Sequence, residues 1–503
     1  MTKGHHHPLP SIKDARQPKT RAESKLYFVF VIIFGFSFAS FLLTSITTTT
    51  PKYGDSVPHL KGKESVLSEF LRAEKGKAMD GYRPFSGVTS KLTPNVSYHV
   101  VFSTSCTDQQ NWESYVFFYH AWKVGQPGNI TRIASGCSPK ESEELEKFHN
   151  AHIRSMSDAF HLHLTPDFSR FRGSNGKPNA YKYMNKPYGL RHWLESVLKM
   201  NDPTNRPDGV EDGIVMLPDP DMVLLRPLVH DFTNEDVIFV EKEPATKIVK
   251  HGFPISQQDG YLSSGVWIGL NVSYITNGER LPASVTVKSG PIHWNTGPPY
   301  MATVRDMYQI AVRWTEYAPR VHDIHPKLFA EMYGFIFATT QLNLPFTMIK
   351  SIVVSEPTTP NREGWPYVDA LPNDQVCAPP PSAPLPIGLH YCKRYLLDKW
   401  FFSKYRLKKN YISCEAPLLT SPPVDLATRG YDYWYQPPPH GHQGEWQAPT
   451  GNISAKQAKR EAFMLCGMIS AVNEAATYYK VTACNGSANM NKTYNFFDDP
   501  HHR

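Results

Sequence analysis

The feature that most constrains this chain is an alternation of strand-like and helix-like segments that begins at Tyr98. The strand-like segments are short apolar runs, and the helix-like segments carry apolar residues at helical spacing. In chain order, the strands are predicted at 98–103, 129–134, 160–164 and 214–217 and the helices at 112–124, 138–151 and from Pro187 onward. This alternation predicts an α/β fold with a Rossmann-type, mostly parallel mixed sheet and flanking helices. No GxGxxG segment is present, so a dinucleotide cofactor is not supported.

Later segments are less regular. Further strands are predicted at 237–240 and 265–270, and further helices at 298–317, 326–340 and 454–479. The last of these helices has one apolar face, formed by Ala462, Leu465, Cys466, Ile469 and Val472. Proline-rich composition and charge divide the chain into a tail (1–25), an apolar segment (26–43), a stem (44–94), the main α/β domain (95–415), and a Pro-rich segment with a C-terminal helical extension (416–503).

The apolar segment 26–43 contains no charged residue and is just long enough to cross a bilayer as a helix. Basic residues precede it, so the positive-inside rule predicts a single-pass type II protein with residues 1–25 in the cytoplasm. A cleaved signal peptide is the alternative, but the basic region is long and no small-x-small cleavage site follows. N-glycosylation sequons agree with a lumenal domain, because they all follow the segment: Asn95, Asn129, Asn271, Asn452, Asn485 and Asn491.

Charge and cysteine content narrow the function classes. The formal net charge is +7, but basic residues are concentrated in the tail and the rest is near neutral, so the chain lacks a domain-wide nucleic-acid footprint. None of the 7 cysteines forms a CxxC pair, which argues against zinc. In a lumenal protein most would form disulfides, and an odd number leaves at least one free or intermolecular.

The sharpest chemical signal follows the strand predicted at 214–217. There the sequence reads Leu217-Pro218-Asp219-Pro220-Asp221. Ligands of open α/β sheets bind beyond the carboxyl ends of strands, and two carboxylates there can hold Mn²⁺ or Mg²⁺ beside a substrate diphosphate. An Asp-x-Asp pair is also common in plain turns, which is the alternative interpretation.

A second cluster of functional residue types lies in the segment from Leu389 to Arg394. His390 is the candidate third metal ligand, and a structural histidine is the alternative. Lys393 and Arg394 could neutralise phosphate oxygens, or form a solvated basic pair.

Several phrases resemble those of the plant and algal hydroxyproline O-arabinosyltransferases and the related peptidyl serine α-galactosyltransferases. They include HVVFSTSC, NKPYGLRHWL, LPDPDMVLLRPL, GPIHWNTGPPY, AEMYGF and LHYCKRYLLDKWFFSKYRL, in order over about residues 97–415. The resemblance implies a GT-A-like fold, a UDP-sugar donor, a divalent metal (Mn²⁺ or Mg²⁺), retention of anomeric configuration and a Golgi or ER membrane location. The metal motif of the arabinosyltransferases is typically Glu-Pro-Asp and that of the galactosyltransferases is more often Asp-Ala-Asp, so Asp219-Pro220-Asp221 leaves the donor sugar and the acceptor open.

The same resemblance assigns site residues. Asp219 and Asp221 match the metal motif, His390 matches the histidine of an HYCQRY-like segment, and Asn185 and Lys186 fall near the nucleotide or diphosphate. Our leading hypothesis is transfer of L-arabinofuranose to hydroxyproline of secreted proteins, with galactosyl transfer to peptidyl serine as the alternative. A non-catalytic lumenal glycan- or protein-binding protein on the same fold is the alternative from another class.

The catalytic carboxylate and the sugar pocket are predicted from the residues themselves. Glu331 is the first candidate carboxylate because it opens an apolar helix in a matched motif, although a structural or helix-capping glutamate is the alternative. Asp306 is a second candidate. Trp294 and Asn295 are predicted to shape the sugar pocket, with a core tryptophan as the ordinary alternative.

Overall fold

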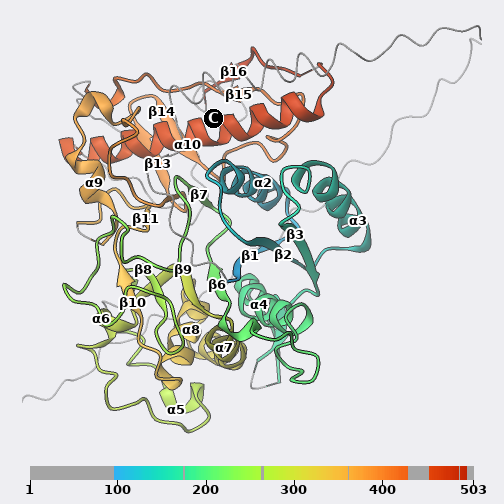
Figure 1. Cartoon of the computed structure of the whole chain (residues 1–503), viewed down its shortest axis with the longest axis vertical. Coiled ribbons are helices and arrows are strands. Elements are labelled where there is room, and N and C mark those ends of the chain that lie inside the picture. Colours follow the sequence, from blue (N-terminus) through green and yellow to red (C-terminus); the bar gives the residue numbers. More distant parts are fainter. Residues whose placement is uncertain are drawn as a thin grey trace, which may run out of the picture. The chain divides into compact units, whose positions relative to one another are not determined.

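The four strands predicted at 98–103, 129–134, 160–164 and 214–217 form one part of a seven-stranded sheet with the order β10-β8-β9-β6-β1-β2-β3, whose other three strands were not predicted (Figure 1). The computed structural model describes residues 96–173, 176–261, 265–360, 362–428, 453–486 and 488–495. The sheet strands are β1 (Tyr98–Ser105), β2 (Asn129–Ser135), β3 (Phe160–Thr165), β6 (Ile214–Leu217), β8 (Ile255–Gln258), β9 (Thr296–Thr303) and β10 (Thr347–Ile349). β9 runs antiparallel to β6 and β8, and the other pairs are parallel. The mixed α/β class is therefore confirmed.

The two faces of this sheet bury separate hydrophobic cores. Val100 and Phe102 of β1 pack in one core with residues of α2 and α10, whereas Val101 packs in the other with α4, α7 and α8. The alternation follows from the pleat, which directs successive side chains to opposite faces. The helices are α2 (Asp108–Lys123), α3 (Pro139–Phe148), α4 (Asn185–Ser196), α5 (Val272–Ile275), α6 (Gly290–His293), α7 (Val304–Ile324), α8 (Ala330–Gln341), α9 (Trp365–Ala370) and α10 (Ala455–Ala483).

Smaller sheets lie beside the main one. A three-stranded sheet has the order β11-β12-β7, and β13 pairs with β14 in a hairpin. Further short pairs join β4 to β5 and β15 to β16. The bounds are β4 (Arg170–Arg172), β5 (Pro178–Ala180), β7 (Met222–Leu224), β11 (Val353–Val354), β12 (Gly388–His390), β13 (Arg394–Leu397), β14 (Trp400–Ser403), β15 (Leu418–Leu419) and β16 (Thr493–Tyr494).

Three local predictions are wrong. The segment 298–303 is part of the buried strand β9 rather than the start of a helix, because it pairs with both β6 and β8. Residues 265–270 form turns, with the Ile268 N–H donating to the Gly265 carbonyl, instead of a strand. Residues 237–240 contribute only an isolated bridge between Phe239 and Ile349.

Helix α10, from the predicted C-terminal extension (416–503), packs against α2, β12 and β13 of the predicted main α/β domain (95–415). Its predicted apolar face is buried, and a Cβ at Gly467 would stand only 2.8 Å from Leu389 Cδ1 of β12. Figure 1 shows the helix lying along α2 and the β13–β14 hairpin. Since its partners come from segments far apart in sequence, no local pattern reveals that the helix completes the core.

Disulfides tie the described segments together, as predicted. Cys106–Cys137 joins the ends of β1 and β2, and two further bonds join α10 to the preceding chain: Cys377–Cys466 and Cys414–Cys484. Cys392 is the cysteine left free.

The predicted tail, apolar segment and stem lie outside the described residues. None of the helices within the described ranges combines the length and the apolar character that a membrane crossing requires.

Candidate metal centre

Strand pairing brings His390 to the Asp-x-Asp motif. β6 ends at Leu217 and β7 begins at Met222, so Asp219 and Asp221 lie in the short connection between two sheets. β12 pairs antiparallel with β7, with His390 opposite Met222, and the Tyr391 N–H donates to the Asp221 carbonyl at 3.0 Å. The register therefore places a residue from far along the chain beside the two aspartates.

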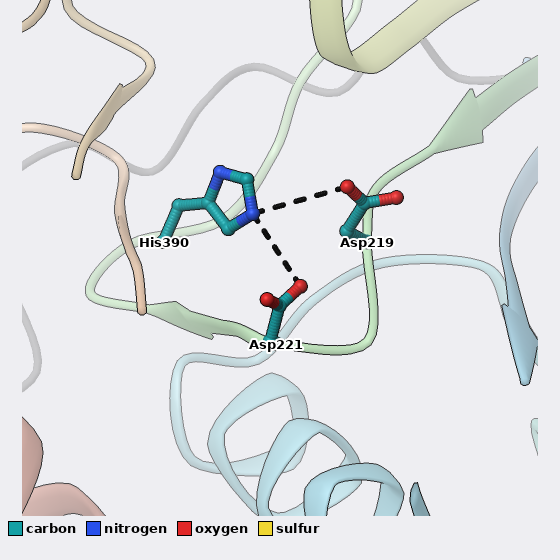
Figure 2. Close-up of side chains that lie close together, drawn as sticks. All are labelled: Asp219, Asp221 and His390. Atoms are coloured by element: carbon teal, nitrogen blue, oxygen red, sulfur yellow. Dashed lines mark ion pairs between the residues drawn. The ribbon is translucent and has the colours of Figure 1, made fainter. Parts of the chain in front are cut away.

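The three side chains converge on one point (Figure 2). His390 Nε2 lies 3.8 Å from Asp219 Oδ2 and 3.4 Å from Asp221 Oδ1. One potential ligand atom from each residue lies within 4.8 Å of the others. Ligand oxygens at about 2.1 Å from a Mg²⁺-like ion stand roughly 3 Å apart, so a small contraction would let all three reach one cation. Two carboxylates and an imidazole also form a donor set that suits Mn²⁺ or Mg²⁺.

Each aspartate is also paired with a lysine. Lys186 Nζ lies 2.6 Å from Asp219 Oδ1, and Lys404 Nζ lies 2.5 Å from Asp221 Oδ2. Burial alone would lower the pKa of both lysines, but the neighbouring carboxylates outweigh it and raise the pKa, so both stay charged. Burial likewise opposes ionisation of Asp221, yet Lys404 and His390 hold its pKa well below the usual range.

A buried glutamate lies beyond each lysine. Glu331, in the first turn of α8, has a pKa raised to about 7 by burial, with Lys186 opposing and Asp219 adding to the shift. Burial also raises the pKa of Glu113 of α2 to about 7, against the influence of Lys404. Among the described residues, Glu331 Oε1 has no hydrogen-bond partner. A buried carboxylate oxygen without a partner is unusual in folded proteins and marks Glu331 as a candidate functional group.

Of the residues predicted to bind the diphosphate, Lys186 pairs with a metal-motif aspartate, whereas Asn185 and Lys393 have other partners. Lys186 belongs to the centre, whereas the neighbouring Asn185 accepts a hydrogen bond from the Phe168 N–H at 2.8 Å and helps to hold the start of α4. Lys393 forms an ion pair with Glu356 at 3.1 Å. Lys393 ends the connection between β12 and β13, and Arg394 is the first residue of β13.

Trp294 and Asn295 precede β9 and are buried. The Asn295 carbonyl accepts a hydrogen bond from the Asp259 N–H, and the charge of Asp259 interacts with that of His390. Trp294 packs in the core shared by α7 and α8. Asn295 thus supports the edge of the centre through Asp259, whereas Trp294 is a core residue.

Asp306 is not brought to the centre. Thr303 pairs with Ile214, at the start of β6, and Asp306 follows in the first turn of α7. It therefore lies at the opposite end of β6 from Asp219, where its carboxylate accepts a hydrogen bond from the Gly252 N–H at 2.7 Å. This geometry makes Asp306 a structural residue.

Sequence reasoning missed Lys404, Glu113 and Asp259. Lys404 directly follows β14, which begins with three aromatic residues. A charged residue at the end of such a strand could have indicated a functional position. Glu113 is a charged residue that stands one turn before the apolar Val116 and Phe117 of the buried part of α2, and this position is also unusual for a glutamate. Asp259 follows β8, at a strand end on the same sheet.

Comparison with known proteins supports the resemblance seen in the motifs. The chain is 26% identical over 269 residues to a peptidyl serine alpha-galactosyltransferase from Arabidopsis thaliana, covering 51% of this chain and 27% of that protein. The chain thus spans about a quarter of the length of this curated relative. The resemblance to this glycosyltransferase family is confirmed by the match. No protein-family model matches the chain.

Solved structures show a more distant likeness. The galactosyltransferase LgtC, in complex with donor and acceptor sugar analogues, is 10% identical, with a TM-score of 0.33 over 58% of this chain and 87% of LgtC. The bifunctional glycosyltransferase WbbM, in its apo form, is also 10% identical, with a TM-score of 0.30 over 60% of this chain and 47% of WbbM. At these scores neither structure serves as a template for the activity of this chain.

Proposed function

We propose that this protein is a metal-dependent glycosyltransferase that moves a sugar from a UDP-sugar to a peptidyl acceptor. The observation that carries the proposal is the convergence of Asp219, Asp221 and His390 at a strand end, with two buried lysines around them. Nucleotide-sugar diphosphates are substrates that need both a divalent cation and neighbouring basic groups. The match to a peptidyl serine alpha-galactosyltransferase supports the same class.

Each residue of the centre has a distinct task in this proposal. Asp219, Asp221 and His390 would hold Mn²⁺ or Mg²⁺, which supplies positive charge to offset the charge that develops on a leaving diphosphate. Lys186 and Lys404 hold the aspartates in place and lie within reach of phosphate oxygens. The buried setting strengthens these charge interactions because little water screens them.

Glu331 is our candidate for the carboxylate beside the reacting sugar carbon. It is buried, one of its oxygens has no hydrogen-bond partner among the described residues, and its charge interacts with Lys186 and Asp219. In a retaining transfer such a carboxylate can attack the sugar carbon as the bond to the UDP diphosphate breaks, which gives a covalent intermediate. The acceptor hydroxyl then displaces the carboxylate and gives up its proton, which an oxygen of the leaving diphosphate can accept. Lys186 favours the ionised carboxylate that this role requires.

The donor and acceptor are proposed from the relatives. The name of the curated relative favours galactose as the sugar and peptidyl serine as the acceptor. Transfer of L-arabinofuranose to hydroxyproline, our leading hypothesis from the sequence motifs, is the second candidate. We also propose a Golgi or ER location with the centre in the lumen, because the disulfides of the described domain fit an oxidising compartment.

A transfer assay tests the proposal. The full chain is incubated with Mn²⁺, UDP-galactose or UDP-arabinofuranose, and peptides that contain serine or hydroxyproline, and products are read by mass. A hexose on serine supports the first candidate, and a pentose on hydroxyproline supports the second.

The Asp221→Asn variant is the matched control, and it should transfer no sugar. Its circular dichroism spectrum is compared with that of the wild type to show that it is folded. Full activity in this variant would show that the metal centre is misassigned. Absence of transfer by the wild type with every pair would favour the non-catalytic binding protein.

A further inference from the structure

The two aspartates of the centre are held in the same way. One oxygen of each carboxylate is paired with a lysine, and the other oxygen faces His390. For Asp219 the distances are 2.6 Å from Oδ1 to Lys186 and 3.8 Å from Oδ2 to His390. For Asp221 they are 2.5 Å from Oδ2 to Lys404 and 3.4 Å from Oδ1 to His390. Each aspartate therefore has a single oxygen left for a cation.

The lysines come from separate parts of the fold and are nearly buried. Lys186 belongs to α4 and Lys404 follows β14, and their side chains are only 15% and 13% exposed. Neither can exchange its carboxylate for bulk water without moving out of the protein. Their charges consequently remain at the centre whatever else binds there.

We propose that Lys186 and Lys404 make the binding of the divalent cation and of the donor diphosphate mutually dependent. The inference rests on the proposed function, and it concerns the order and strength of binding at the same centre. The two lysines offset the charge of the two aspartates, so the centre attracts a lone divalent cation weakly. A diphosphate supplies the missing negative charge, and the cation and the lysines then share its oxygens.

Electrostatics in a buried site makes this dependence large. Adding a divalent cation to carboxylates that are already paired brings its charge close to two buried lysines, where few water molecules can screen the repulsion. When no cation is bound, the negative charges of a diphosphate are repelled by the two aspartates. Because linkage is reciprocal, the factor by which UDP tightens Mn²⁺ binding equals the factor by which Mn²⁺ tightens UDP binding.

The test measures Mn²⁺ binding to the full chain, with and without saturating UDP, from the electron paramagnetic resonance signal of free Mn²⁺. We expect UDP to tighten Mn²⁺ binding to the wild type at least about tenfold, within the usual range of such linkage. In the absence of UDP, Lys186→Met and Lys404→Met should each bind Mn²⁺ more tightly than the wild type does. Saturating UDP should then increase the Mn²⁺ affinity of these variants by less than about threefold.

Two further variants make the comparison specific. Lys123→Met removes a lysine that pairs with Glu474 between α2 and α10, and it should keep the wild-type dependence. Lys404→Arg retains the positive charge, so it should keep most of the dependence of Mn²⁺ binding on UDP. Thermal unfolding of each variant checks that it is folded.

The outcomes separate this inference from the proposed function. Mn²⁺ and UDP that bind the wild type independently would overturn the inference and leave the glycosyltransferase proposal standing, and this measurement suffices even if a methionine variant fails to fold. A dependence that survives in both methionine variants would also overturn it. If the wild type binds neither Mn²⁺ nor UDP, both proposals fall.

Discussion

Replacing Glu461 by glutamine should stabilise the protein at alkaline pH. Glu461 lies on the buried side of α10, where its Oε2 accepts a hydrogen bond from the Leu396 N–H at 3.1 Å. Burial raises its pKa to about 8, against an ordinary value of 4.5. Glutamine has nearly the same shape and keeps an oxygen for the Leu396 N–H, so the substitution removes chiefly the cost of ionisation.

The magnitude follows from the pKa. Because the folded-state pKa of Glu461 lies above that of the unfolded chain, the protonated carboxyl stabilises the fold fully below about pH 4.5, and this contribution is lost as the pH rises through about 8. At about 1.4 kcal/mol per pKa unit, the wild type should lose roughly 3 kcal/mol between pH 5 and pH 8 that Glu461→Gln retains.

Urea unfolding followed by tryptophan fluorescence, with the disulfides intact, measures this difference at pH 5 and pH 8. Glu474→Gln is the matched control, because it removes the same charge from the same helix at a half-exposed position paired with Lys123. The reasoning is refuted if the stability gap between Glu461→Gln and the wild type does not widen with pH, or if Glu474→Gln shows the same widening.

Further predictions concern packing, a buried ion pair and the reacting carboxylate. Gly334→Ala should lower the free energy of unfolding by about 1–3 kcal/mol in denaturant titrations, because its Cβ would lie 2.8 Å from the Ala318 backbone where α7 meets α8; an unchanged midpoint would contradict the close approach. Arg460→Met should cost roughly 1–3 kcal/mol in the same assay, since it removes the donor from the Pro357 and Thr359 carbonyls while Asp369 keeps Lys456 as a partner; an unchanged free energy of unfolding would contradict this prediction. Glu331→Gln should reduce kcat at least about a hundredfold in the transfer assay with little change in thermal stability; near-normal turnover would remove Glu331 from the reaction.

The sequence predicts those residues of the metal centre whose positions follow from residues close to them in the chain. Asp219 and Asp221 follow a short apolar strand, and such a strand end is visible in the chain itself. His390 was proposed as the third ligand from its residue type, and the resemblance of its segment to a known family supported this assignment. The part of the central sheet formed by β1, β2, β3 and β6 was predicted because these strands alternate with helices along the chain, whereas β8, β9 and β10 were not.

The missed parts depend on pairing between distant segments. Lys404 reaches Asp221 only because β12 pairs with β7 and a hairpin follows β12, and no local pattern encodes that register. The segment 298–303 was predicted to begin a helix, yet pairing on both sides draws it into the sheet. Tertiary contacts outweigh local preference at such positions.

The position of α10 in the chain has a consequence for biosynthesis. This helix packs against α2, which shares a core with one face of the central sheet, and against the strand that carries His390, yet the ribosome makes it after all the other helices described here. Until residue 484 has emerged, apolar side chains of α2 that pack against α10 remain uncovered, and Cys414 has no partner. The nascent chain should therefore depend on chaperones and on late disulfide formation, and the metal centre should mature only after translation of α10 is complete.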